Sequence, residues 1–326
     1  MARPRPASRH FELERIAPGV HAAIATVDGF GLCNSGIVDL GGVSVVFDSM
    51  LTPMAGADLV RATRRLTGRA PGFVVNSHYH GDHHWGNSAF VDAHVVSTRR
   101  TREEIQRKSR AQFRAWRREL PKELVGLDDP HGPYAPADVP QLRGWFRGVL
   151  ATPASLPIVP PSVTFTDELV LEGTRRQLRL ISYGGGHSPS DVFGYLPDER
   201  IVFAGDLALE GYHLSVGDGW PHAWGRILDR MRRLRVERVV PGHGALGDAG
   251  TLARSREYLR TLERIVARAR REGASLDAVR KTPVPPAYRA LRFSFMFAEA
   301  LQRTYRLARP RRARARRPST RGHLSR

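Results

Sequence analysis

The segment that most constrains this chain is NSHYHGDHHWGN, in which four histidines and one aspartate lie within residues 76–87. It follows directly on the apolar run FVV, so these polar side chains are expected at the end of a buried strand. Residues two apart in extended backbone point to the same side, so His78 and His80 can bind one metal ion. Asp82 and His83 lie just beyond, where the chain must turn, and can reach a second ion nearby.

Three later segments repeat this order of apolar strand, glycine-containing turn and candidate ligand, and they end at His187, Asp206 and His243. Glycine lets the backbone turn tightly, and ligand sites at the carboxyl ends of strands are a recurrent arrangement. His187 would complete three nitrogens around the first ion, and His243 would join Asp82 and His83 at the second. Asp206 has two carboxylate oxygens and can bridge both ions. Three ligands at each ion, with a shared position for water, are typical of an open catalytic site.

Taken in order, these motifs resemble those of the metallo-β-lactamase superfamily of metallohydrolases. The resemblance extends over about residues 16–259 and rests on a complete His-x-His-x-Asp-His from His78 to His83, GGGHSPSD around His187, FAGD ending at Asp206 and PGHG around His243. It implies an α/β fold, a four-layer αββα sandwich with the metals at one edge between two sheets.

Details of the motifs narrow this resemblance. Asp206 stands where some true β-lactamases carry cysteine or serine, which favours the glyoxalase II-like and general hydrolase branches. His80 stands where flavodiiron oxidoreductases carry glutamate, which counts against dioxygen chemistry. Asp48, in VVFDSM, resembles an early family motif whose acid orients the site, and the alternative is that it only ends a strand. His84 is interpreted as a residue behind the ligands rather than a ligand.

The resemblance implies a binuclear metal-dependent hydrolase. A metal-bridging hydroxide would attack the carbonyl of an ester, thioester, lactone or amide in a small-molecule substrate, and Asp82 would orient that hydroxide. The nitrogen and oxygen ligands suit two Zn²⁺ ions, with Mn²⁺ or Fe²⁺ as alternatives. Three other functions stay open: a phosphodiesterase or nuclease of the same fold, a metal-dependent oxygenase acting on sulfur compounds, and a binding protein that keeps its metals for structure.

Charge and composition divide the chain into three parts. Residues 1–15 form a basic segment, residues 16–302 the metallo-β-lactamase-like domain, and residues 303–326 a tail with ten arginines and no acid, predicted to be disordered. The tail supplies much of the net charge of +19. It could bind nucleic acid weakly, although a solvated tail is the favoured interpretation.

The lack of a recognisable targeting signal and the single cysteine predict a cytoplasmic protein. No apolar run approaches the roughly 20 residues of a membrane span, and the N-terminal segment lacks the apolar region of a secretory signal. The lone Cys33 cannot form an internal disulfide, and we interpret it as a buried small residue rather than a nucleophile.

Apolar runs between turn residues predict two batches of strands, with helices between them. The first batch covers residues 20–27, 35–40, 43–48, 73–76 and 94–97, and the second covers residues 163–165, 168–173, 177–182, 192–196, 201–204 and 237–240. Gly41-Gly42 predicts a hairpin. Thr52 and Pro53 predict the start of a helix, and Gly68 its end.

A helical insertion is predicted over residues 100–161, opened by a capping box of Thr101 and Glu104. Its aromatic residues could form a lid over the site or a dimer surface: Trp116, Trp145 and Phe146. A second aromatic group follows Asp206 and could either wall a substrate pocket or pack in the interior: Tyr212, His213, Trp220, His222 and Trp224.

Overall fold

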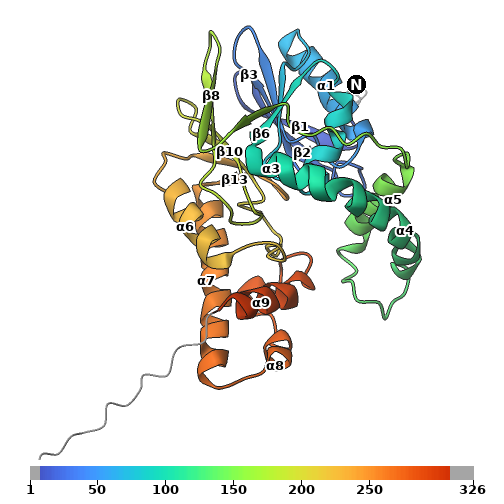
Figure 1. Cartoon of the computed structure of the whole chain (residues 1–326), viewed down its shortest axis with the longest axis vertical. Helices are drawn as coiled ribbons and strands as arrows, with labels where there is room; N and C mark the ends of the chain where they lie inside the picture. Colours follow the sequence, from blue (N-terminus) through green and yellow to red (C-terminus); the bar gives the residue numbers. More distant parts are fainter. Residues whose placement is uncertain (1–7, 309–326) are drawn as a thin grey trace, which may run out of the picture.

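A computed structural model describes residues 8–308 as two β-sheets packed face to face, with helices outside them (Figure 1). The first sheet has seven strands in chain order: β1 (Phe11–Ala17), β2 (Val20–Ala25), β3 (Ser35–Asp39), β4 (Ser44–Phe47), β5 (Phe73–Val75), β6 (His94–Thr98) and β7 (Val163–Phe165). The first four strands pair antiparallel, and β4 to β7 pair parallel.

The second sheet has six strands in the order β13-β12-β11-β10-β9-β8. Their bounds are β8 (Glu168–Glu172), β9 (Gln177–Ile181), β10 (Phe193–Leu196), β11 (Ile201–Gly205), β12 (Arg238–Pro241) and β13 (Gly247–Asp248). Only β11 and β12 pair parallel, and helix α6 (Pro221–Met231) lies between them in the chain. The strands of the first predicted batch all lie in the first sheet. The second batch is wrong at one strand, because residues 163–165 form β7, which pairs parallel with β6 in the first sheet.

Three apolar layers hold the sandwich together. Between the sheets, Phe47 from the first stacks on Phe203 from the second, with ring centroids 5.7 Å apart. Outside the first sheet, Leu59 of helix α1 (Pro53–Thr67) packs in one cluster with Val46 and Val74. Outside the second sheet, α6 packs with α7 (Ala249–Arg271) and α9 (Met296–Leu307) in a third cluster. The predicted αββα architecture is confirmed.

Local sequence signals explain why these elements begin and end where they do. The β3–β4 hairpin turns at Gly41 and Gly42, whose φ angles of 83° and 87° favour glycine. Helix α1 begins at Thr52, whose side chain accepts a hydrogen bond from Ala55 N. It ends at Gly68, in the left-handed conformation with φ 75°. All three predictions are confirmed.

The insertion consists of α3 (Arg99–Glu104), a π-helical turn (Ile105–Ser109), α4 (Arg110–Gly126) and α5 (Val139–Ala151). The predicted capping box is wrong. Thr98 caps α3 by accepting a hydrogen bond from Thr101 N, because the chain leaves β6 directly into the helix. Glu104 is instead buried against basic side chains, with Lys108 Nζ 3.1 Å from its carboxylate.

Both predicted boundaries of the domain need correction. Strand β1 begins at Phe11, inside the segment predicted to precede the domain, because Phe11 is fully buried and pairs with Ala25 of β2. Helix α9 continues to Leu307, past the predicted start of the tail at residue 303, because its buried face extends to Thr304. The rest of the predicted tail, from residue 309, lies outside the described residues.

Shorter helices complete the fold: α2 (Gly81–His84), a 3-10 turn (Trp85–Ala89), α8 (Leu276–Arg280) and a second 3-10 turn (Pro286–Tyr288). None of the helices between residues 8 and 308 combines the length and the apolar character needed to cross a lipid bilayer.

Candidate metal centre

Three histidines and one aspartate converge where strands of both sheets end. His78 follows β5 and His80 precedes α2, and their Nε2 and Nδ1 atoms lie 2.9 Å apart. His187, after β9, brings its Nε2 to 3.2 Å from the first and 3.0 Å from the second. Asp206 Oδ2 lies 3.4 Å from His187 Nε2. These four side chains form the first ligand group.

A second ligand group lies beside the first and consists of Asp82, His83 and His243. Asp82 Oδ2 lies 3.3 Å from both His83 Nε2 and His243 Nε2. The other carboxylate oxygen of Asp206, Oδ1, lies 3.3 Å from His83 Nε2 and 3.4 Å from His243 Nε2. Asp206 thus directs one oxygen to each group, which is the geometry expected of a bridging ligand.

The spacing of these atoms fits metal coordination. Ligand atoms of a tetrahedral site with bonds of about 2.0–2.1 Å lie about 3.3 Å apart, close to the distances in both groups. His83 Nε2 and Asp206 Oδ1 are buried and have no hydrogen-bond partner among the described residues. A buried polar atom without a partner is costly, so a cation at this point would satisfy both atoms.

Hydrogen bonds on the far side of the rings decide which histidine nitrogens carry protons. His187 Nδ1 lies 2.9 Å from the Ser215 carbonyl oxygen, and His243 Nδ1 lies 3.1 Å from the Leu32 carbonyl oxygen. A carbonyl oxygen only accepts, so in the neutral rings Nδ1 is the donor and Nε2 presents a lone pair to the centre. Supporting bonds of this kind orient metal-binding histidines.

Asp48 supports His83 in the same way. His83 Nδ1 donates to Asp48 Oδ2 over 2.8 Å, and the other oxygen accepts from Ser77 N over 2.7 Å. Asp48 is buried and has a φ of 62°, a strained conformation for a residue other than glycine. The structure therefore places Asp48 directly behind one predicted ligand.

The carboxylates of Asp82 and Asp206 make the second ligand group electrostatically favourable for a positive charge. Burial opposes ionisation of Asp206, yet His243, His83 and His187 hold its pKa well below the usual range. Burial likewise disfavours the charged form of His243, but Asp206 and Asp82 outweigh it and raise the pKa of that ring to about 10. Buried carboxylates that stay ionised beside histidines suit a divalent cation.

Comparison with known proteins identifies the family. Residues 28–243, more than half of the chain, match the sequence model of the metallo-beta-lactamase superfamily. The chain belongs to the metallo-β-lactamase superfamily. Its predicted membership is confirmed, whereas its assignment to the glyoxalase II-like branch stays a prediction.

Curated relatives match only part of the chain. The metallo-beta-lactamase type 2 of Bacteroides fragilis is 30% identical over 115 residues, 34% of this chain and 45% of that protein. The metallo-beta-lactamase type 2 of Bacillus sp. (strain 170) is 32% identical over 82 residues, 24% of this chain and 32% of that protein. The chain thus spans less than half the length of these curated relatives.

Solved structures show the same fold over a longer stretch. A metallo-beta-lactamase from Pontibacter korlensis has a TM-score of 0.57 at 18% identity, covering 77% of this chain and 99% of that one. The DIM-1 metallo-beta-lactamase has a TM-score of 0.54 at 18% identity, covering 77% and 98%. At these identities the likeness shows the superfamily fold alone.

One supporting network was not found from the sequence. His80 Nε2 lies 3.3 Å from Asp218 Oδ2, which also accepts a hydrogen bond from the hydroxyl of Tyr79. Lys108, from the π-helical turn, donates to the same hydroxyl over 3.1 Å. These residues lie on three separate segments, so no local motif could have indicated them.

His84 and Cys33 stay outside the two ligand groups. His84 Nε2 lies 3.1 Å from Ser109 Oγ, which accepts a hydrogen bond from Trp85 Nε1. The His84 ring therefore contacts a residue of the insertion and does not support a predicted metal ligand. Cys33 is buried, and burial raises the pKa of its thiol to about 12. This agrees with the interpretation of Cys33 as a buried residue without a nucleophilic role.

A cavity of about 220 Å³ opens against both ligand groups. Its wall includes His80, Asp82, Asp206 and His243, together with apolar and aromatic side chains. Of the two predicted aromatic groups, four members line this cavity: Trp116, Trp145, Tyr212 and His213. Phe146 and Trp224 are buried in the interior, which for Trp224 is the packing alternative given above. The insertion therefore contributes to the wall of the site.

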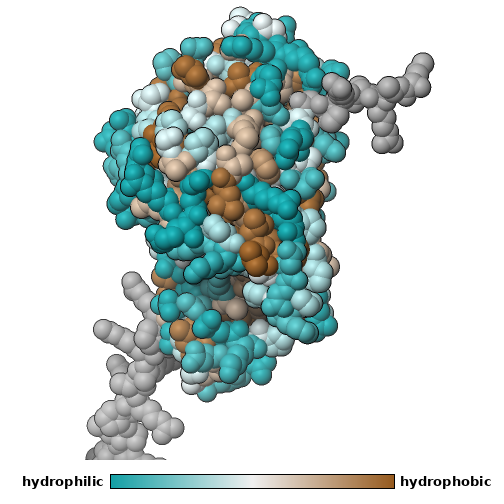
Figure 2. Space-filling view, turned by 90° about the vertical axis from the view of Figure 1, so that its right-hand side faces the viewer, coloured by the Kyte–Doolittle hydropathy of each residue, from teal (hydrophilic) through white to brown (hydrophobic). Residues whose placement is uncertain are grey.

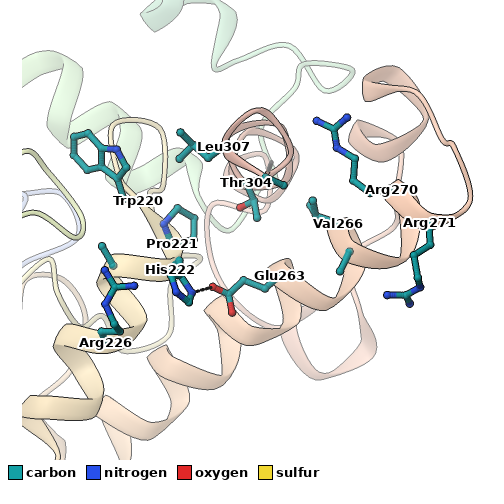
Figure 3. Close-up of a pocket in the computed structure, with 13 residues that line it drawn as sticks. Trp220, Pro221, His222, Arg226, Glu263, Val266, Arg270, Arg271, Thr304 and Leu307 are labelled. Atoms are coloured by element: carbon teal, nitrogen blue, oxygen red, sulfur yellow. Dashed lines mark ion pairs between the residues drawn. The ribbon is translucent and has the colours of Figure 1, made fainter. Parts of the chain in front are cut away.

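A larger cavity of about 960 Å³ lies elsewhere, between α6, α7 and α9 (Figure 3). Trp220 and His222 line it, and His222 Nδ1 lies 3.4 Å from Glu263 Oε1. No member of either ligand group lines this cavity, so its size does not make it the reaction site. On the face seen in Figure 2, hydrophobic residues form short patches among hydrophilic ones.

Proposed function

We propose that this chain is a metal-dependent hydrolase that binds two divalent ions and cleaves a carbonyl ester, thioester, lactone or amide. The observation that carries the proposal is the division of the Asp206 carboxylate, with Oδ2 toward His187 and Oδ1 toward His83 and His243. A buried carboxylate divided in this way is placed to join two cations.

The proposed ligands of the first ion are His78, His80, His187 and Asp206, and those of the second are Asp82, His83, His243 and Asp206. Bound divalent ions supply a water whose pKa is lowered from 15.7 to about 7, and they polarise a carbonyl oxygen. The all-nitrogen and oxygen set suits Zn²⁺, with Mn²⁺ and Fe²⁺ as the alternatives.

The protein's own groups would bind and orient the reactants. Asp82 lines the cavity with its carboxylate ionised, because His83 and His243 outweigh the effect of burial and hold its pKa well below the usual range. It can therefore accept a hydrogen bond from an attacking water and fix the direction of its lone pair. The apolar wall would exclude other water molecules from the carbonyl.

Metal depletion and reconstitution test this proposal. Protein stripped by a chelator should lose hydrolysis of a panel of aryl esters, lactones and thioesters, and Zn²⁺, Mn²⁺ or Fe²⁺ should restore it. Elemental analysis should find about two ions per chain in the active form. If the protein binds its full complement of metal ions and still hydrolyses no carbonyl substrate, the proposed function is wrong.

The cavity wall does not favour the phosphodiesterase or nuclease alternative. Its wall contains no lysine or arginine among the described residues, whereas phosphodiester substrates are usually bound through such groups. Cleavage of a labelled RNA that disappears at modest salt would nevertheless support the nuclease, and oxygen consumption with a persulfide would support the oxygenase.

A further inference from the structure

The cavity beside the ligand groups is built largely from two parts of the chain that lie far apart in sequence. The insertion contributes Trp116 from α4 and Trp145 from α5, whose ring centroids lie 5.1 Å apart. On the C-terminal side, Phe293 pairs with Tyr212 at 5.4 Å between centroids. We call this cavity, with its two aromatic pairs, the aromatic chamber.

Polar contacts behind the wall hold the aromatic chamber in shape. The hydroxyl of Tyr212 donates to Gln141 Oε1 of α5 over 2.6 Å and accepts from Arg292 Nη1 over 2.9 Å. Phe293 N donates to Asp138 Oδ2 over 3.1 Å. The insertion and the C-terminal segment are thus fastened together, so the walls are largely formed before a ligand enters.

The charges of the chamber determine what it can bind. The only ionisable acids in its wall, Asp82 and Asp206, belong to the ligand groups, and no arginine or lysine lines it among the described residues. Arg292, which lies behind the wall, is already engaged by Tyr212 and by the Ala137 carbonyl oxygen. Apart from the ions proposed at the two ligand groups, the wall therefore offers no cation, and a carboxylate or phosphate that lies away from those ions and from the scissile bond would be buried unpaired.

Two polar atoms of the wall have no partner. Trp145 Nε1, a donor, and Gln112 Oε1, an acceptor, are buried without a hydrogen bond among the described residues. Among the described residues, the wall thus offers a neutral donor and a neutral acceptor side chain, and no lysine or arginine. At about 220 Å³ the chamber is smaller than the roughly 300–1,000 Å³ of most ligand pockets. It suits a compact group with a flat ring, which packs well against aromatic faces.

Building on the proposed hydrolase, we propose that the substrate is an uncharged carboxylic ester or lactone whose compact, ring-bearing part binds in the aromatic chamber. One water is consumed for each ester. Its oxygen forms a bond to the carbonyl carbon, the bond between that carbon and the alkoxy oxygen breaks, and a proton passes to the departing alcohol. An ester gives one carboxylic acid and one alcohol, and a lactone gives a single hydroxy acid.

A matched pair of esters tests the charge preference. Phenyl butyrate and phenyl hemisuccinate share the alcohol and the number of acyl carbons, but the second ends in a carboxylate. Metal-loaded protein should hydrolyse the butyrate with a kcat/KM at least about tenfold higher, because the chamber leaves the carboxylate unpaired. Hydrolysis of both at equal rates, or a preference for the hemisuccinate, would overturn the inference and leave the proposed function standing.

Variants locate the preference in the chamber. Met296→Lys places a cation in the wall and should lower the butyrate to hemisuccinate ratio by about tenfold, whereas Met296→Gln, of similar length, should leave the ratio near that of the natural protein. Met54→Lys makes the same charge change on the exposed side of α1 and should have no effect. A ratio that Met296→Lys and Met54→Lys alter equally would contradict the assignment.

A binding measurement keeps the inference testable without turnover. The ketone 4-phenyl-2-butanone cannot be hydrolysed and should change the tryptophan fluorescence saturably. Phe293→Ala should weaken its binding at least about tenfold, since a wall is lost, and Val91→Ala, at an exposed site, should not. Saturable binding of the ketone without hydrolysis of any ester would contradict the proposed hydrolase function. It would still support the inferred preference of the aromatic chamber for neutral, ring-bearing ligands. No saturable binding would remove the preference itself.

Discussion

At the scale of single residues, the Asp82 carboxylate belongs both to the second ligand group and to the wall of the cavity. It lies 3.3 Å from both His83 Nε2 and His243 Nε2, and no lysine or arginine of the described cavity wall competes for it. Its position therefore links the binding of a cation to the orientation of an attacking water.

Asp82→Asn should reduce kcat by about a hundredfold or more, because an amide has one acceptor oxygen fewer and cannot take up a proton. Turnover, bound metal and the unfolding midpoint should be measured together at saturating metal, because Asp82 is also a proposed ligand of the second ion. Turnover is expected to fall far more than the unfolding midpoint. Asp92→Asn, at an exposed position, is the matched control. Full activity in the Asp82 variant with both ions bound would exclude this carboxylate from the mechanism.

Asp218→Asn should weaken metal binding at the first ligand group by about 10- to 100-fold, because Asp218 Oδ2 orients His80 from 3.3 Å. Titration against a competing chelator would measure this loss. Asp198→Asn makes the same change at an exposed position and should bind metal normally. Unchanged affinity in the Asp218 variant would show that His80 needs no such support.

At the level of the elements, the second sheet places an aromatic ring directly over a glycine of the first sheet. A Cβ added at Gly36 of β3 would lie 2.2 Å from Phe203 Cε1 of β11. A contact this short forces the ring or a strand to move, and the strands after which the predicted ligands lie belong to these same sheets.

Gly36→Ala should lower the free energy of unfolding by about 1–3 kcal/mol, the usual cost of overpacking a core. Chemical denaturation would measure the change. Gly126→Ala adds the same atom at the end of α4, where nothing lies within 4 Å, and should leave stability nearly unaltered. Equal stabilities for the two variants would mean that the sheets can separate at Gly36 without cost.

At the scale of the whole molecule, the ligand groups join the two halves of the sandwich. His78 to His83 follow β5 of the first sheet, while His187, Asp206 and His243 follow strands of the second. Bound ions would therefore connect the sheets and relieve the repulsion between Asp82 and Asp206.

Metal removal should lower the thermal unfolding midpoint. An ion present at about 100 times its Kd contributes about 2.7 kcal/mol, and for a chain of this size each kcal/mol corresponds to roughly 2–4 °C. Scanning calorimetry with and without chelator would measure the difference. His222→Ala, which changes a histidine outside both groups, should show the same difference as the natural protein. An identical midpoint for stripped and loaded protein would contradict the predicted connection.

Stability should also depend on pH through His10. Burial, with Arg9 and Arg61, lowers the pKa of His10 from 6.5 to about 4, and its Nδ1 accepts a hydrogen bond from Phe30 N. The folded state therefore favours the neutral ring, so this contribution is present above pH 6.5 and is lost as the pH falls toward about 4.

His10→Asn keeps an acceptor but does not titrate, so its stability should fall less steeply between pH 6.5 and 4. Denaturation midpoints at several pH values would compare it with the natural protein, and His222→Asn at an exposed position should keep the natural slope. Parallel curves for the natural protein and the His10 variant would show that this ring does not contribute.

Features that depend on neighbours along the chain could be predicted from the residues alone. The turn at Gly41-Gly42 and the limits of α1 follow from local backbone preferences, and the spacing of His78, His80, Asp82 and His83 follows from one strand and one turn. The order of the later motifs also indicated which distant residues would join them, because each comes at the end of an apolar strand.

Features that depend on contacts between distant segments could be found only in the folded protein. Asp218 reaches His80 across 138 positions, and Tyr212 meets Gln141 across 71. Strand β1 and the last turns of α9 form because the body of the fold buries one face of each. Such contacts carry no periodic or motif signal, since their energy comes from burial and hydrogen bonding that exist only after the sheets have packed.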